Sequence, residues 1–126
     1  MIEGLDHLVL TVASLDASAA FYRRVLGMTV EVTPGRPTAF KFGNQKINVH
    51  QAERTFSPNA RQPTPGSADF CLITNWPIDA VIRHVEAAGV AIELGPVTRN
   101  GARGDMLSVY FRDPDGNLVE VSRYRD

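Results

Sequence analysis

Four side chains in this sequence could bind a metal ion, and each lies in a stretch that otherwise predicts a packed strand. Glu120 interrupts the apolar run in "FRDPDGNLVEVS", and His7 opens "HLVLTV". His50 lies in "KINVHQ", and Asp69 precedes "FCLI". Imidazole nitrogens and carboxylate oxygens suit divalent ions of the Mn, Fe, Co, Ni or Zn kind. If the fold brings these side chains together, they predict a metal centre.

The first half of the chain predicts one strand, one helix and three more strands. The helix is expected over 15–26, with Ser14 as its N-cap and Gly27 as the left-handed residue that ends it. Phe21 and Tyr22 are expected in the core. The predicted strands are 6–12, 28–32, 37–42 and 46–51, with turns at Pro34-Gly35 and Gly43-Asn44.

The second half repeats this plan. A shift of 62 positions, counted from the residue numbers, pairs His7 with Asp69 and Gly27 with Gly89 without a gap. Asn75 then falls in the cap region of a second helix, "IDAVIRHVEAAG", with Pro77 near its start. A loop is expected over 94–105, followed by strands over 106–112 and 117–124. The turn that joins these strands, residues 113–116, sets the direction of Glu120.

The repeat defines two βαβββ modules, residues 1–51 and 67–126, joined by a Pro/Ser-rich linker over 52–66. A chain of 126 residues fits one domain, so we expect 1–126 to form a single α+β domain.

Alternation along the strands predicts which faces are buried. Val119 and Val121 form a wholly apolar face of the last strand, whereas Glu120 lies on the opposite, mixed face. The strands at 7–12, 47–50 and 69–73 divide in the same way. This pattern predicts an open, curved mixed sheet with helices outside and a partly polar cavity inside.

The same symmetry predicts that positions 7, 48, 69 and 120 converge, with His50 one step beyond Asn48 on the same face. A second shift of 72 positions sets Asn48 opposite Glu120 in the repeat. Carboxylates and histidine buried together without an ion carry a large desolvation cost. A divalent ion would remove that cost, so we expect His7, His50, Asp69 and Glu120 to be metal ligands, with Asn48 as the alternative to His50.

Bulk properties exclude some partners. The net charge of −1 gives no electrostatic reason to bind nucleic acid or an anionic membrane. No apolar run approaches the ~18 residues that span a bilayer. Cys71 is the only cysteine, which favours a reducing compartment and a cytoplasmic protein.

The stretches "DHLVLTVASLDASAAFYRRVLGM" and "VYFRDPDGNLVEVS", with the paired modules, resemble the vicinal oxygen chelate superfamily. That superfamily includes glyoxalase I, extradiol dioxygenases, fosfomycin-resistance enzymes and bleomycin-binding proteins. The resemblance implies a metal held from the first, fourth, fifth and last strands, with His7 and Glu120 at the first and last places. Asp69 stands where the family commonly has histidine, and the fourth-strand place falls to Asn48 or His50.

The leading hypothesis is a metal-dependent enzyme whose small substrate binds through two neighbouring oxygens, most simply a glyoxalase-like (lactoylglutathione-lyase-like) lyase or isomerase. Glu120 would be catalytic, moving protons. An extradiol dioxygenase is the alternative if His7, His50 and Glu120 hold Fe(II). A metal-free drug- or metabolite-binding protein, like bleomycin-resistance proteins, is the second alternative. Relatives with two modules commonly dimerise, so a homodimer is expected.

Simpler interpretations compete with each of these. Glu120 could face water, His7 could be structural, His50 could end its strand, and Asp69 could be a turn acceptor. Cys71 is more simply a packing residue than a thiolate. Solvated loop charge is the simpler explanation of the loop arginines, although they could bind an anionic substrate. These arginines are Arg54, Arg61, Arg99 and Arg103.

Overall fold

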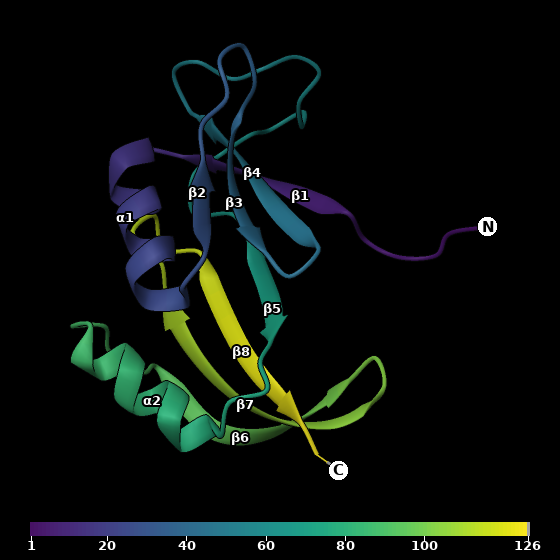
Figure 1. Ribbon diagram of the computed structural model, residues 1–126, viewed down its shortest axis with the longest axis vertical. Coiled ribbons are helices and arrows are strands. Elements are labelled where there is room, and N and C mark those ends of the chain that lie inside the picture. The colour runs from purple at the N-terminus through teal and green to yellow at the C-terminus, as the bar shows by residue number, and fades with distance from the viewer. Residues whose placement is uncertain (126) are drawn as a thin grey trace. The chain divides into compact units, whose positions relative to one another are not determined.

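A computed structural model describes residues 1–125, and the chain divides into two compact units, Met1–Ser67 and Ala68–Asp126. The first unit contains β1 (His7–Val12), α1 (Leu15–Leu26), β2 (Thr29–Glu31), β3 (Thr38–Phe42) and β4 (Gln45–Gln51). The second contains β5 (Asp69–Ile73), α2 (Ile78–Ala87), β6 (Leu94–Gly101), β7 (Gly104–Arg112) and β8 (Leu118–Tyr124) (Figure 1). Neither helix is long and apolar enough to cross a membrane, among the residues described.

Each unit is a four-stranded mixed sheet with one helix. The strand order is β1-β4-β3-β2 in the first unit and β5-β8-β7-β6 in the second. The first strand of each unit pairs in parallel with the last, and the remaining pairs are antiparallel. The predicted α+β class and βαβββ plan are therefore confirmed, with strand pairing confined to each unit.

The signals at the ends of α1 are confirmed. Ser14 has an extended backbone, and its hydroxyl accepts a hydrogen bond from the Ala17 N–H at 3.2 Å. Gly27 has φ of +68°, and its N–H donates to the carbonyl of Arg23 at 3.1 Å. Glycine adopts this left-handed conformation without the steric cost that other residues meet. The second helix differs, because its N-cap is Pro77 and no side chain caps it.

The core of the first unit is aromatic where helix meets sheet. Tyr22 is completely buried, and its ring lies 5.1 Å from that of Phe40 on β3 and 5.2 Å from that of Phe21. In the second unit, Val81 and Val85 of α2 are buried on the side of the helix that contacts β7. The buried apolar side chains of each helix therefore face its own sheet, and the core position predicted for Phe21 and Tyr22 is confirmed.

The strand register confirms the two shifts of the repeat. Val9 pairs with Asn48 between β1 and β4, and Cys71 pairs with Glu120 between β5 and β8. Val9 and Cys71 are 62 positions apart, from 71 − 9, and Asn48 and Glu120 are 72 apart, from 120 − 48. Asn48 and Glu120 are therefore equivalent positions in the two sheets.

The prediction of a loop over 94–105 is wrong. Residues Leu94–Gly101 form β6, which makes a hairpin with β7 through Gly101 and Gly104. The prediction failed because Gly95, Pro96, Gly101 and Gly104 in this stretch are typical loop residues. They serve instead as a hairpin turn and as a register shift between Leu94 and Val97.

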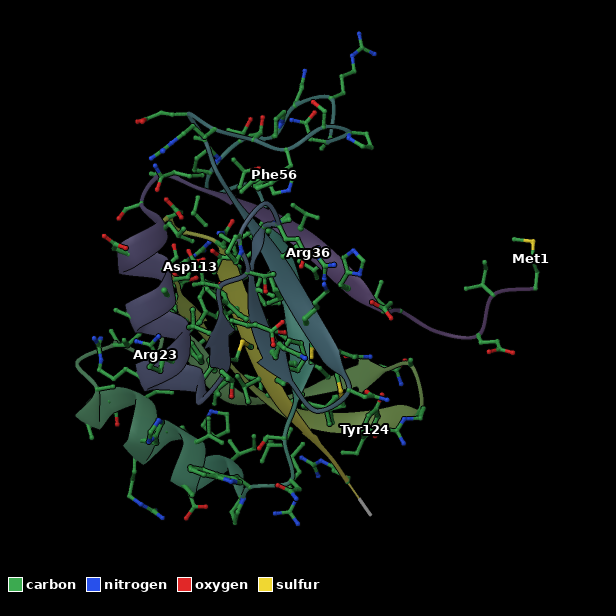
Figure 2. The ribbon with its side chains drawn as sticks, turned by 45° about the horizontal axis from the view of Figure 1, so that its top comes forward. Met1, Arg23, Arg36, Phe56, Asp113 and Tyr124 are labelled. Atoms are coloured by element: carbon green, nitrogen blue, oxygen red, sulfur yellow. The ribbon has the colours of Figure 1, made fainter. Side chains whose placement is uncertain are left out.

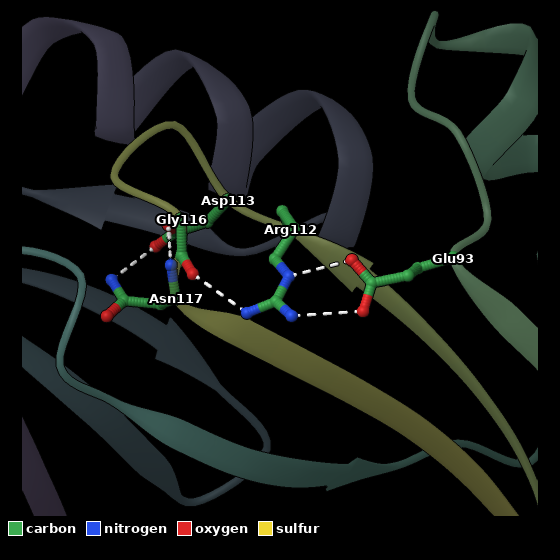
Figure 3. Close-up of polar contacts among 5 residues, drawn as sticks. All are labelled: Glu93, Arg112, Asp113, Gly116 and Asn117. Carbon is green, nitrogen blue, oxygen red and sulfur yellow. Dashed lines mark hydrogen bonds and ion pairs between the residues drawn. The ribbon is translucent and has the colours of Figure 1, made fainter.

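The turn between β7 and β8 is confirmed and is held by buried polar side chains (Figure 3). The Asp113 carboxylate accepts hydrogen bonds from the backbone N–H groups of Asp115 and Asn117 and from the Asn117 amide, at 2.8–3.0 Å. Asn117 in turn accepts the Ala68 N–H at 2.8 Å, next to the start of β5. Beside the turn, Arg112 donates twice to Glu93 and once to the Gly116 carbonyl.

Replacing Asp113 with alanine should destabilise the protein strongly. The change leaves three donors without their acceptor, and buried donors of this kind cost about 1–3 kcal/mol each before relaxation. We expect a loss of about 3 kcal/mol in the free energy of unfolding, measured by urea denaturation. Asp105→Ala, an exposed carboxylate on β7, is the matched control and should leave the midpoint unchanged. Equal midpoints for the two variants would contradict the assigned role of Asp113.

Candidate functional site

The four predicted ligands divide equally between the two units. His7 and His50 belong to the first unit, and Asp69 and Glu120 to the second. Over residues 1–125, neither unit by itself gathers three His, Cys, Asp or Glu side chains into a group that could hold a metal ion. The four-residue ligand set remains a prediction.

In the first unit, β1 and β4 place His7, Asn48 and His50 on one face. His7 is opposite Lys46, Val9 is opposite Asn48, and Thr11 is opposite His50. His50 is thus four residues further along this face than His7, a distance of about 13 Å along the strands, whereas Asn48 is only two residues further. The register makes Asn48 the nearer neighbour of His7.

His7 is partly exposed and has an acidic neighbour. Its Nδ1 lies 2.8 Å from the Asp6 carboxylate, and 40% of the side chain is accessible. The hydrogen bond to His7 lowers the pKa of Asp6 below its ordinary value. When Nδ1 donates to Asp6, the lone pair is on Nε2, which is the tautomer that a metal ligand needs.

His50 and Asn48 contain buried atoms without hydrogen-bond partners. These are His50 Nδ1 and Asn48 Oδ1, for which residues 1–125 provide neither donor nor acceptor. The His50 ring lies 5.4 Å from that of Phe56, a linker residue labelled in Figure 2. Desolvation by burial lowers the pKa of His50, so its imidazole is neutral at neutral pH. Unpartnered buried polar atoms indicate a place for water, an ion or a ligand.

In the second unit, Glu120 lies on the mixed face predicted for it, at the wall of a cavity of about 420 Å³. The cavity lies on this face of the β5-β8-β7-β6 sheet. Its lining includes the following residues: Cys71, Ile73, Arg99, Asn100, Gly101, Ala102, Met106, Glu120 and Tyr124. Asp69 shares the face of Glu120 but starts β5 and is exposed.

A chain of hydroxyl groups orients the Glu120 carboxylate. Ser122 donates a hydrogen bond to Glu120 Oε2 at 3.1 Å. The Ser122 hydroxyl also lies 2.6 Å from that of Ser108 and 3.1 Å from the Cys71 sulfur. Because Ser122 uses its one proton on Glu120, the Ser108 hydroxyl is the donor to Ser122. Both serines are completely buried, so hydroxyl groups in the protein interior orient the Glu120 carboxylate.

Glu120 has no cationic partner within the described part of the second unit. The ion pairs there join Arg83 to Asp79 and Arg112 to Glu93. A half-buried carboxylate that is oriented by a neutral hydroxyl keeps its second oxygen available. That oxygen could bind a metal ion or accept a proton.

The sequence prediction missed Ser108, Tyr110 and Tyr124, which share the face of Glu120. Tyr110 is directly opposite Glu120, and Met106 is opposite Tyr124. Figure 2 shows Tyr124 beside the β6–β7 hairpin. Alternation along "MLSVYFR" would have placed Ser108 and Tyr110 on the cavity side, so the signal was present in the sequence.

Two successive βαβββ units of this kind define the glyoxalase-like class of α+β domain. The model of the glyoxalase/bleomycin resistance protein/dioxygenase superfamily matches residues 4–121. The chain belongs to this superfamily.

The chain is similar to several named proteins. It is 49% identical to virulence protein STM3117 of Salmonella typhimurium over 98% of this chain and 86% of that protein. The crystal structure of that protein has a TM-score of 0.97, covering 99% of both chains. The chain is 43% identical to the glyoxalase domain-containing protein RDO1 of Mycosarcoma maydis, over 99% of this chain and 70% of that protein.

Two further similarities carry names of activities. Metallothiol transferase FosB of Shouchella clausii is 30% identical over 96% of this chain and 80% of that protein. A lactoylglutathione lyase from Agrobacterium tumefaciens has a TM-score of 0.75 and 29% identity, covering 98% of this chain and 95% of the other.

The Cys71 thiol should react slowly at neutral pH. Burial raises its pKa, and the negative charge of Glu120 raises it further, although the hydrogen bond with Ser122 opposes the shift. The thiolate is the nucleophile, so alkylation of native protein should have a higher pH midpoint than alkylation of unfolded protein. Iodoacetamide labelling across a pH series, read by mass spectrometry in the presence of a chelator, measures both midpoints.

Glu120→Gln removes the charge and should lower the midpoint of native Cys71, so that labelling at a fixed pH becomes faster. Glu93→Gln, which changes an exposed carboxylate of the same unit, is the matched control and should leave the midpoint in place. A midpoint at or below that of the unfolded chain would contradict the assigned environment of Cys71.

Proposed function

We propose that the protein is a divalent-metal-dependent enzyme that acts on a small substrate bound through two neighbouring oxygens. The single observation that carries this proposal is Glu120, a carboxylate oriented by Ser122 on a cavity wall and without a cationic partner in the described second unit. The superfamily match supports it, and so do the names of two relatives, a metallothiol transferase and a lactoylglutathione lyase.

The donor atoms fit a divalent ion. The proposed ligands are His7, Asp69 and Glu120, with His50 or Asn48 as the fourth, as the internal repeat predicts. His7 has a carboxylate at its Nδ1, and both candidates for the fourth place have a buried atom without a partner. Nitrogen and oxygen ligands of this kind accept Zn, Fe, Mn, Ni or Co. When bound, the metal would supply Lewis acidity toward substrate oxygens.

The residues of the chain would supply the proton transfers and the orientation. Glu120 is the proposed catalytic base, because Ser122 holds one carboxylate oxygen and leaves the other available. Ser122 and Ser108 are positioning residues that keep the carboxylate directed to the cavity. The Asp6 carboxylate would keep His7 in the tautomer that has its lone pair on Nε2.

Among the reaction types, a lyase or isomerase of the lactoylglutathione lyase type is the first choice. An extradiol dioxygenase requires His7 and His50 to act together, and the register separates them by four residues along the face. A metal-free binding protein has no need for imidazole and carboxylate groups on both sheets, so it ranks below the two enzymes. We further propose that the protein is a cytoplasmic homodimer, a state that light scattering would test.

Loss of metal in Glu120→Gln tests the proposal. Untagged wild-type protein, loaded with each first-row ion and passed through a desalting column, should retain a stoichiometric metal by elemental analysis. Glu120→Gln and His7→Ala should retain little, because each removes a ligand. Glu93→Gln should match the wild type, since its carboxylate serves Arg112.

Activity separates the reaction types once a metal is found. Formation of lactoylglutathione from methylglyoxal and glutathione would favour the lyase, whereas oxygen uptake with catechol and Fe(II) would favour the dioxygenase. No retained metal in wild-type protein under any loading condition would overturn the enzyme proposal and favour the binding protein.

A further inference from the structure

The cavity of the second unit contains an arginine as well as Glu120. Arg99 lies on β6, opposite Met106 on β7, which is opposite Tyr124 on β8. Glu120 is four residues back along β8, opposite Tyr110. The two charged side chains therefore share one sheet face and one cavity lining, at opposite ends of a stretch of about 13 Å of strand.

The Arg99 guanidinium is held in a fixed orientation. Its Nε donates to the Tyr110 hydroxyl at 2.8 Å, and its Nη1 donates to the Thr98 carbonyl at 3.3 Å. The guanidinium carbon lies 5.4 Å from the centre of the Tyr110 ring. These contacts reduce the entropy that Arg99 would lose on binding, and they leave Nη2 and one Nη1 proton for another partner.

Arg99 lacks the carboxylate partner that Arg112 and Arg83 of its unit have. Arg112 is paired with Glu93, and Arg83 with Asp79. Within the described part of the second unit, no carboxylate pairs with Arg99. Neutral groups position this charge, which distinguishes it from an arginine that stabilises the fold through an ion pair.

The surroundings of Arg99 are positively charged. Arg103 stacks on the Tyr124 ring, with its guanidinium carbon 4.3 Å from the ring centre. Arg125 donates to the Thr98 hydroxyl at 2.9 Å on the opposite face of the sheet and so does not contribute to the cavity. The two guanidinium groups of Arg99 and Arg103 near the β6–β7 hairpin would attract an anion to this end of the cavity.

We propose that Arg99 binds an oxyanionic group of the substrate, a carboxylate or a phosphate-type group, while the reacting atoms lie at Glu120. This rests on the proposed function, because it takes the Glu120 end of the cavity as the reacting end. A planar guanidinium with free N–H groups on both Nη atoms can bind two oxygens of one anion. The substrate is therefore a small anionic molecule, and Tyr110 is the positioning residue that directs Arg99.

Titration with simple anions tests the site without knowledge of the substrate. The probes are succinate, inorganic phosphate and the neutral succinamide, added at constant ionic strength to 15N-labelled full-length protein. The readout is the arginine Nε–H resonances, with that of Arg99 identified by its absence in Arg99→Gln, and calorimetry gives the Kd. The variants are Arg99→Gln, Arg99→Lys, Glu120→Gln and the control Arg83→Gln.

We expect succinate or phosphate, but not succinamide, to bind the wild type and to shift the Arg99 resonance. Arg99→Gln should weaken binding roughly tenfold or more, because charge-assisted hydrogen bonds are lost. The Kd of Arg99→Lys should lie between those of the wild type and Arg99→Gln. The Kd of Arg83→Gln should match that of the wild type. A preference for either anion supports the site and names its oxyanion.

The inference is overturned if the wild type binds neither anion, if Arg99→Gln binds as well as the wild type, or if succinamide binds equally. It is also overturned if Glu120→Gln abolishes binding, because the anion would then be held at the Glu120 end. Conversely, wild-type protein that holds no metal but binds succinate through Arg99 would overturn the metal proposal and leave this inference standing.

Discussion

The buried hydrogen bonds of Asp113 and Asn117 determine where the polar face of the second sheet points. Asp113 closes the turn between β7 and β8, and Asn117 extends the connection to the Ala68 N–H at the start of β5. The side chains of Asp113 and Asn117 thereby hold the start of β8 beside both neighbouring strands, β7 and β5. A change of register by one residue would turn Glu120 and Ser122 to the opposite face, and Val119 and Val121 would enter the cavity. The direction of Glu120 is thus a consequence of a turn that ends four residues before it, from 120 − 116.

The groups beneath Glu120 are neutral, and this sets its chemistry. A buried arginine or lysine in place of Ser122 would pair with the carboxylate and stabilise its ionised form. Ser122 supplies one hydrogen bond and no charge, while Ser108 satisfies Ser122 in turn. Each hydroxyl in this chain is satisfied, so the arrangement has no cost from unpaired donors. Ser122 therefore orients the Glu120 carboxylate without neutralising its charge.

The sequence alone predicted much of the fold, for identifiable reasons. Helix α1 was placed at its observed ends because Ser14 and Gly27 are strong local signals. The equivalence of Asn48 and Glu120 followed from the repeat. Strand β6 was missed because its glycines and proline are typical of loops, and only pairing with β7 makes it a strand. Ser108 and Tyr110 were missed although the alternation of side chains along β7 places them on the same face as Glu120. The contact of Tyr110 with Arg99 spans two steps of the strand, and no local pattern predicts it.

Separate positions for the two charges explain how one small sheet can keep both available. Arg99 and Glu120 would attract each other if they were adjacent, and a salt bridge would occupy both. Four residues along the strands separate the position of Arg99 from that of Glu120. The Arg99 Nε–H is also used in a hydrogen bond to the Tyr110 hydroxyl. Tyr110 lies directly opposite Glu120, and its hydroxyl oxygen accepts the hydrogen bond from Arg99, so one ring connects the two ends without carrying charge. The carboxylate remains available for a cation or a proton, and the guanidinium for an anion.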